Sequence, residues 1–134
     1  MSVGDPSGAN ATWPQHFPDG CPPDDAEPTD SVRYRLVDND PPLEDDFWSE
    51  HELVAAGRKP ARRVDPILAA GVSVLETPEY AAKVRSSFGA FRAKRVAAGS
   101  LENSGVEKQT GRAGHRTWWR PIGDGAWSRF QVLS

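Results

Sequence analysis

The segment Gly114–Pro121, with the sequence GHRTWWRP, gathers side chains that could bind a ligand or a partner. Two adjacent tryptophans are flanked by a histidine and two arginines: His115, Arg116, Trp118, Trp119 and Arg120. Aromatic rings beside arginines suit two kinds of recognition. One is stacking on a nucleic-acid base, and the other is anchoring a protein interface. This segment is therefore the first candidate for a binding site.

The strand pattern of the same segment limits what its two tryptophans can do. Neighbouring side chains of a strand point to opposite faces, so Trp118 and Trp119 cannot both enter one core. The second ring has two alternatives. It packs beneath the N-terminal segment, which brings Trp13 and Phe17, or it stays exposed as an anchor between the arginines.

A basic loop, Gly57–Val64, is the second candidate. Its sequence GRKPARRV carries the cations Arg58, Lys59, Arg62 and Arg63. Clustered Lys and Arg side chains can bind nucleic-acid phosphates, with an affinity that falls steeply as salt is added. Such a loop can equally be solvated or pair with acidic residues of its own chain. Nucleic-acid binding through this loop is therefore a third possible function, less favoured than the two described below.

The sequence lacks the motifs of several common enzyme classes: GxxxxGK[ST], GxGxxG, HExxH, paired CxxC and GxSxG. Cys21 is the only cysteine, which excludes an internal disulfide and fits a reducing compartment. His16, His51 and His115 are scattered singly, and their spacing predicts no metal site. We expect no metal and no resident cofactor.

Four polar residues nevertheless follow a suggestive order. Arg35 lies on a predicted first strand, Ser73 on a strand that precedes a helix, and Glu107 and His115 come late in the chain. This order resembles minimal ADP-ribosyltransferase-like folds, in which such residues surround NAD. The resemblance implies an NAD-using transferase or toxin, although the S-T-S and Q/E-x-E signatures are absent. If the resemblance does not hold, Arg35 is expected to be an exposed charge on a strand, and Ser73 is expected to be a buried hydroxyl that is hydrogen-bonded to the backbone.

The elements that must position these residues predict a small α+β fold. Residues 31–37 alternate apolar and charged side chains with the period of a half-buried strand. The best-defined helix is expected at about 78–88, because Thr77 can cap it, Pro78 suits its first position and Gly89 can end it.

The other elements are shorter. One or two short helices are expected near 40–48 and 65–70, and further strands near 72–76, 91–99, 106–109, 116–121 and 126–133. A PIGDG turn joins the last two strands and could close a C-terminal hairpin. The sheet is therefore predicted to be mostly antiparallel, packed by one well-capped helix and the short ones.

The charge is divided unevenly along the chain. Residues 1–57 carry thirteen acidic and two basic residues, net −11, whereas residues 58–134 carry six and fourteen, net +8. The halves could attract each other within the fold or between two copies, or the basic half could bind nucleic acid. The internal explanation is preferred because the acidic half also contains a predicted core strand.

The N-terminal part looks different from the rest. Residues 1–30 hold six of the twelve prolines, six acids and no lysine or arginine. Such a segment buries too little apolar surface to offset its ordering entropy, which predicts an extended or disordered acidic arm unless it drapes over the domain. Residues 31–134 are then a single α+β domain.

Four segments carry a whole-chain resemblance: GCPPDDAEP, YRLVDNDPPLEDDF, GVSVLETPEYA and HRTWW. Over residues 13–134 they are similar to a family of small bacterial proteins, which implies no particular activity. We expect a cytoplasmic protein, because no secretory signal is visible and no apolar run is long enough for a membrane span.

The favoured function is a non-catalytic accessory module. It would engage a protein partner or a second copy of itself through a Trp/Arg-rich C-terminal hairpin and the basic loop. No membrane partner is expected. The alternative is the NAD-using transferase.

Overall fold

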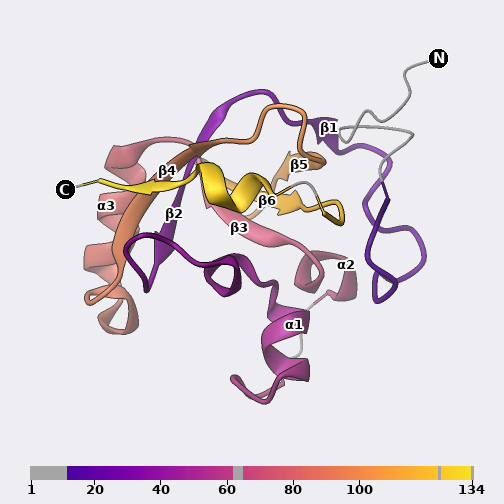
Figure 1. The fold of residues 1–134 in the computed structure, drawn as a ribbon, viewed down its shortest axis with the longest axis horizontal. Helices are drawn as coiled ribbons and strands as arrows, with labels where there is room; N and C mark the ends of the chain where they lie inside the picture. Colours follow the sequence, from indigo (N-terminus) through magenta and orange to yellow (C-terminus); the bar gives the residue numbers. More distant parts are fainter. Residues whose placement is uncertain (1–11, 62–64, 124, 134) are drawn as a thin grey trace.

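The computed structural model describes residues 12–61, 65–123 and 125–133. Seven strands of these residues form one antiparallel sheet with the order β1-β5-β6-β3-β2-β4-β7 (Figure 1). The strands are β1 (Glu27–Pro28), β2 (Val32–Val37), β3 (Val72–Leu75), β4 (Arg95–Ser100), β5 (Val106–Gln109), β6 (His115–Trp119) and β7 (Gln131–Val132).

Short helices connect and cover these strands. The α-helices are α1 (Glu50–Ala55), α2 (Pro66–Ala69) and α3 (Pro78–Ser87). The 3-10 helices are η1 (Glu44–Phe47), η2 (Gly89–Phe91) and η3 (Ala126–Arg129). A mostly antiparallel sheet with one longer helix is the predicted α+β fold, which is thus confirmed. No helix in the described part of the chain has both the length and the apolar character of a membrane span.

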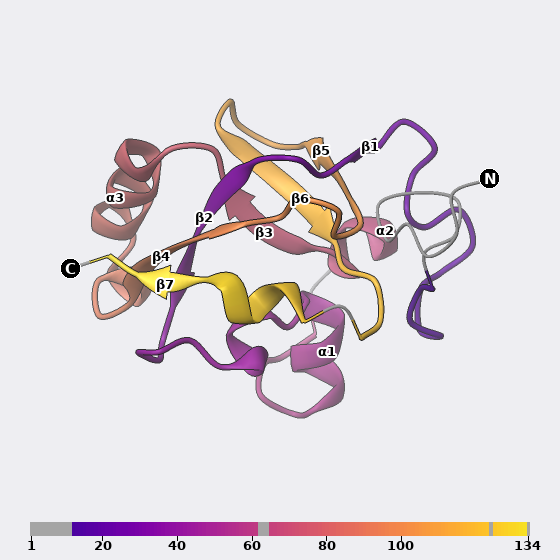
Figure 2. The ribbon, with the colours of Figure 1, turned by 45° about the horizontal axis from the view of Figure 1, so that its top comes forward.

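Helix α3 forms where its local signals place it. Thr77 Oγ1 accepts a hydrogen bond from the backbone N–H of Tyr80 at 3.0 Å, and Pro78 occupies the first turn. The helix ends one residue before the predicted boundary. Figure 2 shows α3 and α2 on either side of β3, which leaves part of the sheet between them uncovered by a helix.

The register places the two tryptophans of β6 on opposite faces of the sheet. Val72 pairs with Trp118, and Ser73 pairs with Thr117. The Trp118 face carries the larger buried cluster: Val37, Phe47, Val72, Val74, Ala97, Leu101, Trp118, Ala126 and Phe130. The Trp119 face carries a smaller one, of Ala70, Val106 and Trp119 with Trp13, Phe17, Cys21, Ala26 and Ile67 packed against it. The sheet therefore has a core on each face.

The N-terminal segment supplies much of the second core. Its described part runs from Thr12 to the short strand β1, which pairs with β5. The carbonyl of Thr12 accepts a hydrogen bond of 2.8 Å from the N–H of Ile122. Residues 12–28 thus pack over the domain, which was the alternative to an extended or disordered arm. Residues 1–11 lie outside the described residues.

The predicted C-terminal hairpin does not form. Strand β6 has β3 on one side and β5 on the other, so neither of its edges is free for a following strand. Instead the chain passes through η3 to β7, which pairs with β4 at the far edge of the sheet. The hairpin prediction was wrong because both edges of β6 are already paired, one with β5, which immediately precedes it in sequence, and the other with the distant strand β3.

The sheet opens between β2 and β3. Strand β2 pairs with β4 at six positions but with β3 at only one, Tyr34 with Leu75. Strands that share a single pair leave their remaining backbone groups in need of other partners. The candidate site lies at this opening.

Candidate active site

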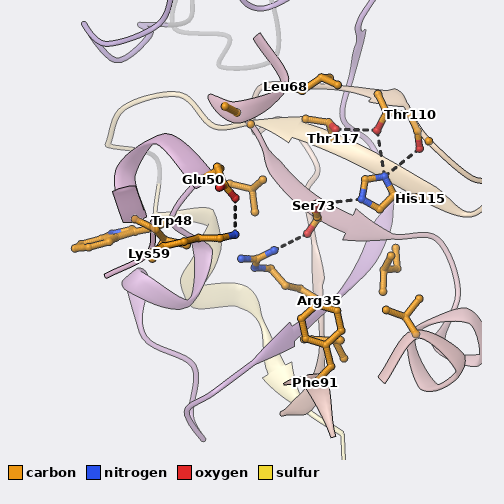
Figure 3. Close-up of a pocket in the computed structure, with 18 of the residues that line it drawn as sticks. Arg35, Trp48, Glu50, Lys59, Leu68, Ser73, Phe91, Thr110, His115 and Thr117 are labelled. Carbon is orange, nitrogen blue, oxygen red and sulfur yellow. Dashed lines mark hydrogen bonds and ion pairs between the residues drawn. The ribbon is translucent and has the colours of Figure 1, made fainter. Parts of the chain in front are cut away.

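A pocket of about 560 Å³ lies where β2 and β3 separate (Figure 3). Leu68 of α2 and Val84 of α3 line it from opposite sides. Its polar and charged lining residues are Arg35, Glu50, Lys59, Ser73, Thr110, His115 and Thr117. Small-molecule sites commonly occupy about 300–1,000 Å³ and combine apolar walls with a few convergent polar groups. The pocket has that character.

Arg35 projects from β2 into the opening of the sheet. Its Nη1 donates to the carbonyl of Ser73 and its Nε to the carbonyl of Asp46, each at 2.7 Å. Burial lowers the pKa of Arg35 to about 10, with the carboxylate of Asp46 opposing the shift and Arg120 adding to it. The guanidinium remains charged at neutral pH. Among the described residues no carboxylate forms an ion pair with it, so its charge can be offered to an anion.

Ser73 and His115 meet on the floor of the pocket. The pairing of Ser73 with Thr117 and of Leu75 with His115 puts the serine and the imidazole on the same face of neighbouring strands. His115 Nε2 lies 3.0 Å from Ser73 Oγ, and the serine is exposed. The alternative of a buried hydroxyl bonded to backbone is therefore wrong for Ser73.

The other imidazole nitrogen is held by Thr110. His115 Nδ1 lies 3.0 Å from the Thr110 carbonyl and 3.1 Å from Thr110 Oγ1, which in turn lies 2.8 Å from Thr117 Oγ1. Four side chains thus form one hydrogen-bonded row along the floor, as Figure 3 shows. This row offers hydroxyl and imidazole groups to a polar ligand.

The segment Trp48–Lys59 forms the opposite wall. A reciprocal pair of hydrogen bonds between Ser49 and Glu52 caps α1 and starts the helix at Glu50. The ammonium of Lys59 donates to Glu50 Oε1. In Figure 3 the Lys59 side chain extends towards the Arg35 guanidinium. The wall therefore presents a cation and a carboxylate to the pocket, with Trp48 at its rim.

Glu107, the fourth residue named by the transferase resemblance, lies elsewhere. It pairs with Trp118 across β5 and β6, which puts it on the other face of the sheet. Its carboxylate forms ion pairs with Arg33 Nε at 2.9 Å and Arg116 Nε at 3.0 Å, and its side chain is 3% exposed. Glu107 thus belongs to a buried ion-pair cluster and not to the pocket.

Neither tryptophan of the GHRTWWRP segment is available as an anchor, because the rings of Trp118 and Trp119 are both fully buried. Their indole N–H groups donate to the carbonyls of Ser104 at 2.6 Å and Ile67 at 2.9 Å. The alternative in which the second ring packs beneath the N-terminal segment is confirmed. An exposed ring between arginines is not what the structure shows.

Four cations of the two binding candidates, all within the described residues, have partners in the chain. Arg116 pairs with Glu76, Arg120 with Glu44, Arg58 with Asp45 and Lys59 with Glu50. Arg62 and Arg63 lie outside the described residues. Further pairs join the acidic and basic halves, namely Lys94 with Asp38 and Lys108 with Asp25. The internal explanation of the divided charge is thereby supported.

Sequence reasoning missed several groups of the pocket. Thr117 could have been found, because alternation along HRTWW places it on the same face as His115. Thr110 holds the imidazole through its backbone carbonyl, a group that every residue type carries and that the sequence therefore cannot point to. Glu50 and Trp48 come from a segment whose position depends on the tertiary fold.

No protein-family model, curated protein or solved structure matches the chain.

Proposed function

We propose that the protein binds NAD in the pocket between β2 and β3 and transfers its ADP-ribosyl group to an acceptor. The observation that carries this proposal is the convergence of Arg35, Ser73 and His115 on one pocket. Arg35 and His115 are 80 positions apart in the sequence. The three residues nevertheless come from three neighbouring strands of the sheet, β2, β3 and β6. Three of the four residues that the resemblance named thus lie together.

The charges of the pocket fit a dinucleotide. NAD contains a pyrophosphate, which needs cationic partners with free N–H groups. Arg35 is a desolvated cation, and only two of its five N–H groups, those bonded to Ser73 and Asp46, are accounted for among the described residues. Lys59 supplies a second cation in the same pocket. Trp48 lines the rim of the pocket, with the Arg58 guanidinium 5.3 Å from the centroid of its ring.

The remaining polar groups fit the part of NAD where the reaction occurs. Transfer breaks the bond between the ribose carbon and the nicotinamide nitrogen, and positive charge develops on the sugar. The row of Ser73, His115 and Thr117 can hydrogen-bond a ribose hydroxyl or the nicotinamide amide. With Glu107 outside the pocket, Glu50 is the carboxylate among the described lining residues; its Oε1 is paired with Lys59, which leaves Oε2 to face positive charge on the sugar.

Binding to a protein partner or a second copy remains a prediction. The buried tryptophans cannot serve as its anchor. A transferase requires an acceptor molecule, so a partner protein would enter this proposal as the acceptor of the ADP-ribosyl group.

The test is release of nicotinamide from NAD by the purified protein, followed by chromatography. We expect release by the wild type and its loss in Arg35→Gln. The matched control is Arg129→Gln, because Arg129 also donates to two backbone carbonyls, those of Ser100 and Glu102, but is exposed and outside the pocket lining. Equal rates for wild type and Arg35→Gln, or no release by the wild type with any acceptor mixture, contradict the proposal.

A further inference from the structure

We infer that Ser73 is a nucleophile activated by His115, and that it forms a covalent bond to the ribose carbon of the bound dinucleotide. The identity of this electrophile rests on the proposed function. The serine–histidine geometry stands without it, because Ser73 Oγ and His115 Nε2 lie 3.0 Å apart within the fold of the chain itself.

The contacts of the imidazole favour one of its two tautomers. A backbone carbonyl can only accept, so the 3.0 Å contact between His115 Nδ1 and the Thr110 carbonyl favours the tautomer with its proton on Nδ1, and Thr110 Oγ1, 3.1 Å from the same nitrogen, can then donate to Thr117 Oγ1. In the neutral ring Nε2 then has a free lone pair and accepts the hydroxyl proton of Ser73. The proton that must leave a nucleophilic serine therefore already points at a base.

The arrangement has the three parts of an activated nucleophile. Catalytic serines are recognised by a base within about 2.6–3.2 Å and a third group that orients the base. Here His115 is the base, and the Thr110 carbonyl takes the position that a carboxylate occupies in the serine protease triad. The third group is neutral, so it fixes the tautomer without stabilising the imidazolium by charge.

Ser73 is also fixed and accessible. Its backbone carbonyl is held by Arg35 at 2.7 Å, and β3 pairs with β6 on the other side at Thr117. The serine is exposed and lines the pocket, so its oxygen can reach a bound ligand without movement of the strand.

The proposed step balances as follows. Ser73 Oγ attacks the ribose carbon, an oxygen–carbon bond forms, and the carbon–nitrogen bond to nicotinamide breaks. Nicotinamide leaves as a neutral molecule with the electron pair, and the serine proton passes to His115 Nε2 and then to solvent. In the second step His115 takes the proton of the acceptor and gives it to Ser73 Oγ as the oxygen–carbon bond breaks. The overall reaction releases one proton.

The first arm of the test asks whether Ser73 is reactive, using a fluorophosphonate probe that needs no NAD. In this reaction the Oγ–P bond forms, the P–F bond breaks, fluoride leaves, and the proton goes to His115. We expect labelling of Ser73 in the wild type and none in Ser73→Ala. In His115→Asn the rate of labelling should be at least about 100-fold lower than in the wild type. Asparagine keeps an N–H near the Thr110 carbonyl and lacks a base at the Nε2 position. Ser86→Ala, on the exposed side of α3, is the control and should label normally.

The second arm mixes the wild type with NAD, quenches rapidly with acid, and reads the Ser73 peptide by mass spectrometry. ADP-ribose on Ser73 supports the inference. Probe labelling without any reaction with NAD supports the nucleophile and contradicts the proposed function alone. Nicotinamide release with an unmodified Ser73 and an active Ser73→Ala variant overturns the inference and leaves the proposed function intact. Absence of probe labelling in the folded wild type also overturns it.

Discussion

The guanidinium of Arg35 donates a hydrogen bond to the backbone carbonyl of Ser73, with 2.7 Å between Nη1 and the oxygen. This bond joins β2 to β3 beyond the single position at which the two strands pair. It satisfies a carbonyl that strand pairing leaves free at the opening of the sheet. One side chain therefore both bridges the opening and carries the positive charge that the pocket offers to a ligand.

Removal of either buried indole should destabilise the protein. Trp118→Ala and Trp119→Ala should each lower the free energy of unfolding by about 3–5 kcal/mol, because each ring fills a core on its own face of the sheet. Urea denaturation measures this change. Phe88→Ala is the control, since Phe88 is 54% exposed and should have a small effect. A tryptophan variant that behaves like Phe88→Ala would contradict the burial of that ring.

Loss of the Glu107 charge should affect stability and spare the reaction. Glu107→Gln leaves Arg33 and Arg116 without their shared counter-charge, which should cost about 3–5 kcal/mol of unfolding free energy. Nicotinamide release per folded molecule should equal that of the wild type, because Glu107 lies on the other face of the sheet from Ser73. Glu102→Gln, an exposed acid, serves as the control. A stable Glu107→Gln variant without activity would place this carboxylate in the site after all.

The thiol of Cys21 should react slowly in the folded protein. Burial raises the pKa of Cys21 from 9.0 to about 11, with the Asp65 carboxylate adding to the shift and Trp119 opposing it. Only the thiolate is alkylated, so at pH 8 the reaction with iodoacetamide should be about 100-fold slower than that of an unperturbed thiol. Mass spectrometry of timed samples with and without urea measures the rates. Equally rapid alkylation under both conditions would show that Cys21 does not pack against the buried cluster around Trp119.

The packing of the N-terminal segment should weaken in mild acid. His16 stacks on His51 of α1, with ring centroids 4.4 Å apart. Burial and the neighbouring His51 lower the pKa of His16 below its ordinary value of 6.5, although Glu52 opposes this. The unfolded chain therefore binds a proton that the folded state disfavours, and stability should fall as the pH decreases through 6.5.

The measurement is the midpoint of urea unfolding at pH 7.5 and pH 5.5. The loss between these two values should be smaller in His16→Gln than in the wild type, because glutamine does not titrate. Other acidic and basic groups near His16, namely Glu44, Glu52 and Arg120, line the adjacent cavity and stay the same in both proteins. An identical loss in the two proteins would rule out His16 as its cause.

Local signals allowed part of this fold to be predicted. The start of α3 follows from the Thr77 cap and Pro78, which act within one turn of the helix, whereas its end is set by the extended conformation of Phe88, and Gly89 begins η2. The opposite orientation of Trp118 and Trp119 follows from strand alternation, whatever the neighbours of β6 are. Strand order was beyond such reasoning, because β6 pairs not only with the preceding strand β5 but also with β3, which is distant in sequence and occupies its other edge. The predicted C-terminal hairpin failed for that reason.

The candidate site divides in the same way. Arg35, Ser73 and His115 were named from their order along the chain, and three adjacent strands bring them together. Glu107 shares that order, but the register of β5 against β6 turns it to the opposite face, and a shift by one residue would have reversed this. The Thr110 carbonyl could not be predicted, because every residue type carries the same backbone group.

The most direct test of the central claim is calorimetric titration of NAD into the purified protein and into Arg35→Gln, with Arg129→Gln as the control. The account predicts saturable binding to the wild type and to the control, and an affinity at least tenfold weaker for Arg35→Gln. That difference corresponds to about 1.4 kcal/mol of binding free energy. The account is contradicted if the folded wild type shows no heat of binding with NAD, or if Arg35→Gln binds NAD as tightly as the wild type.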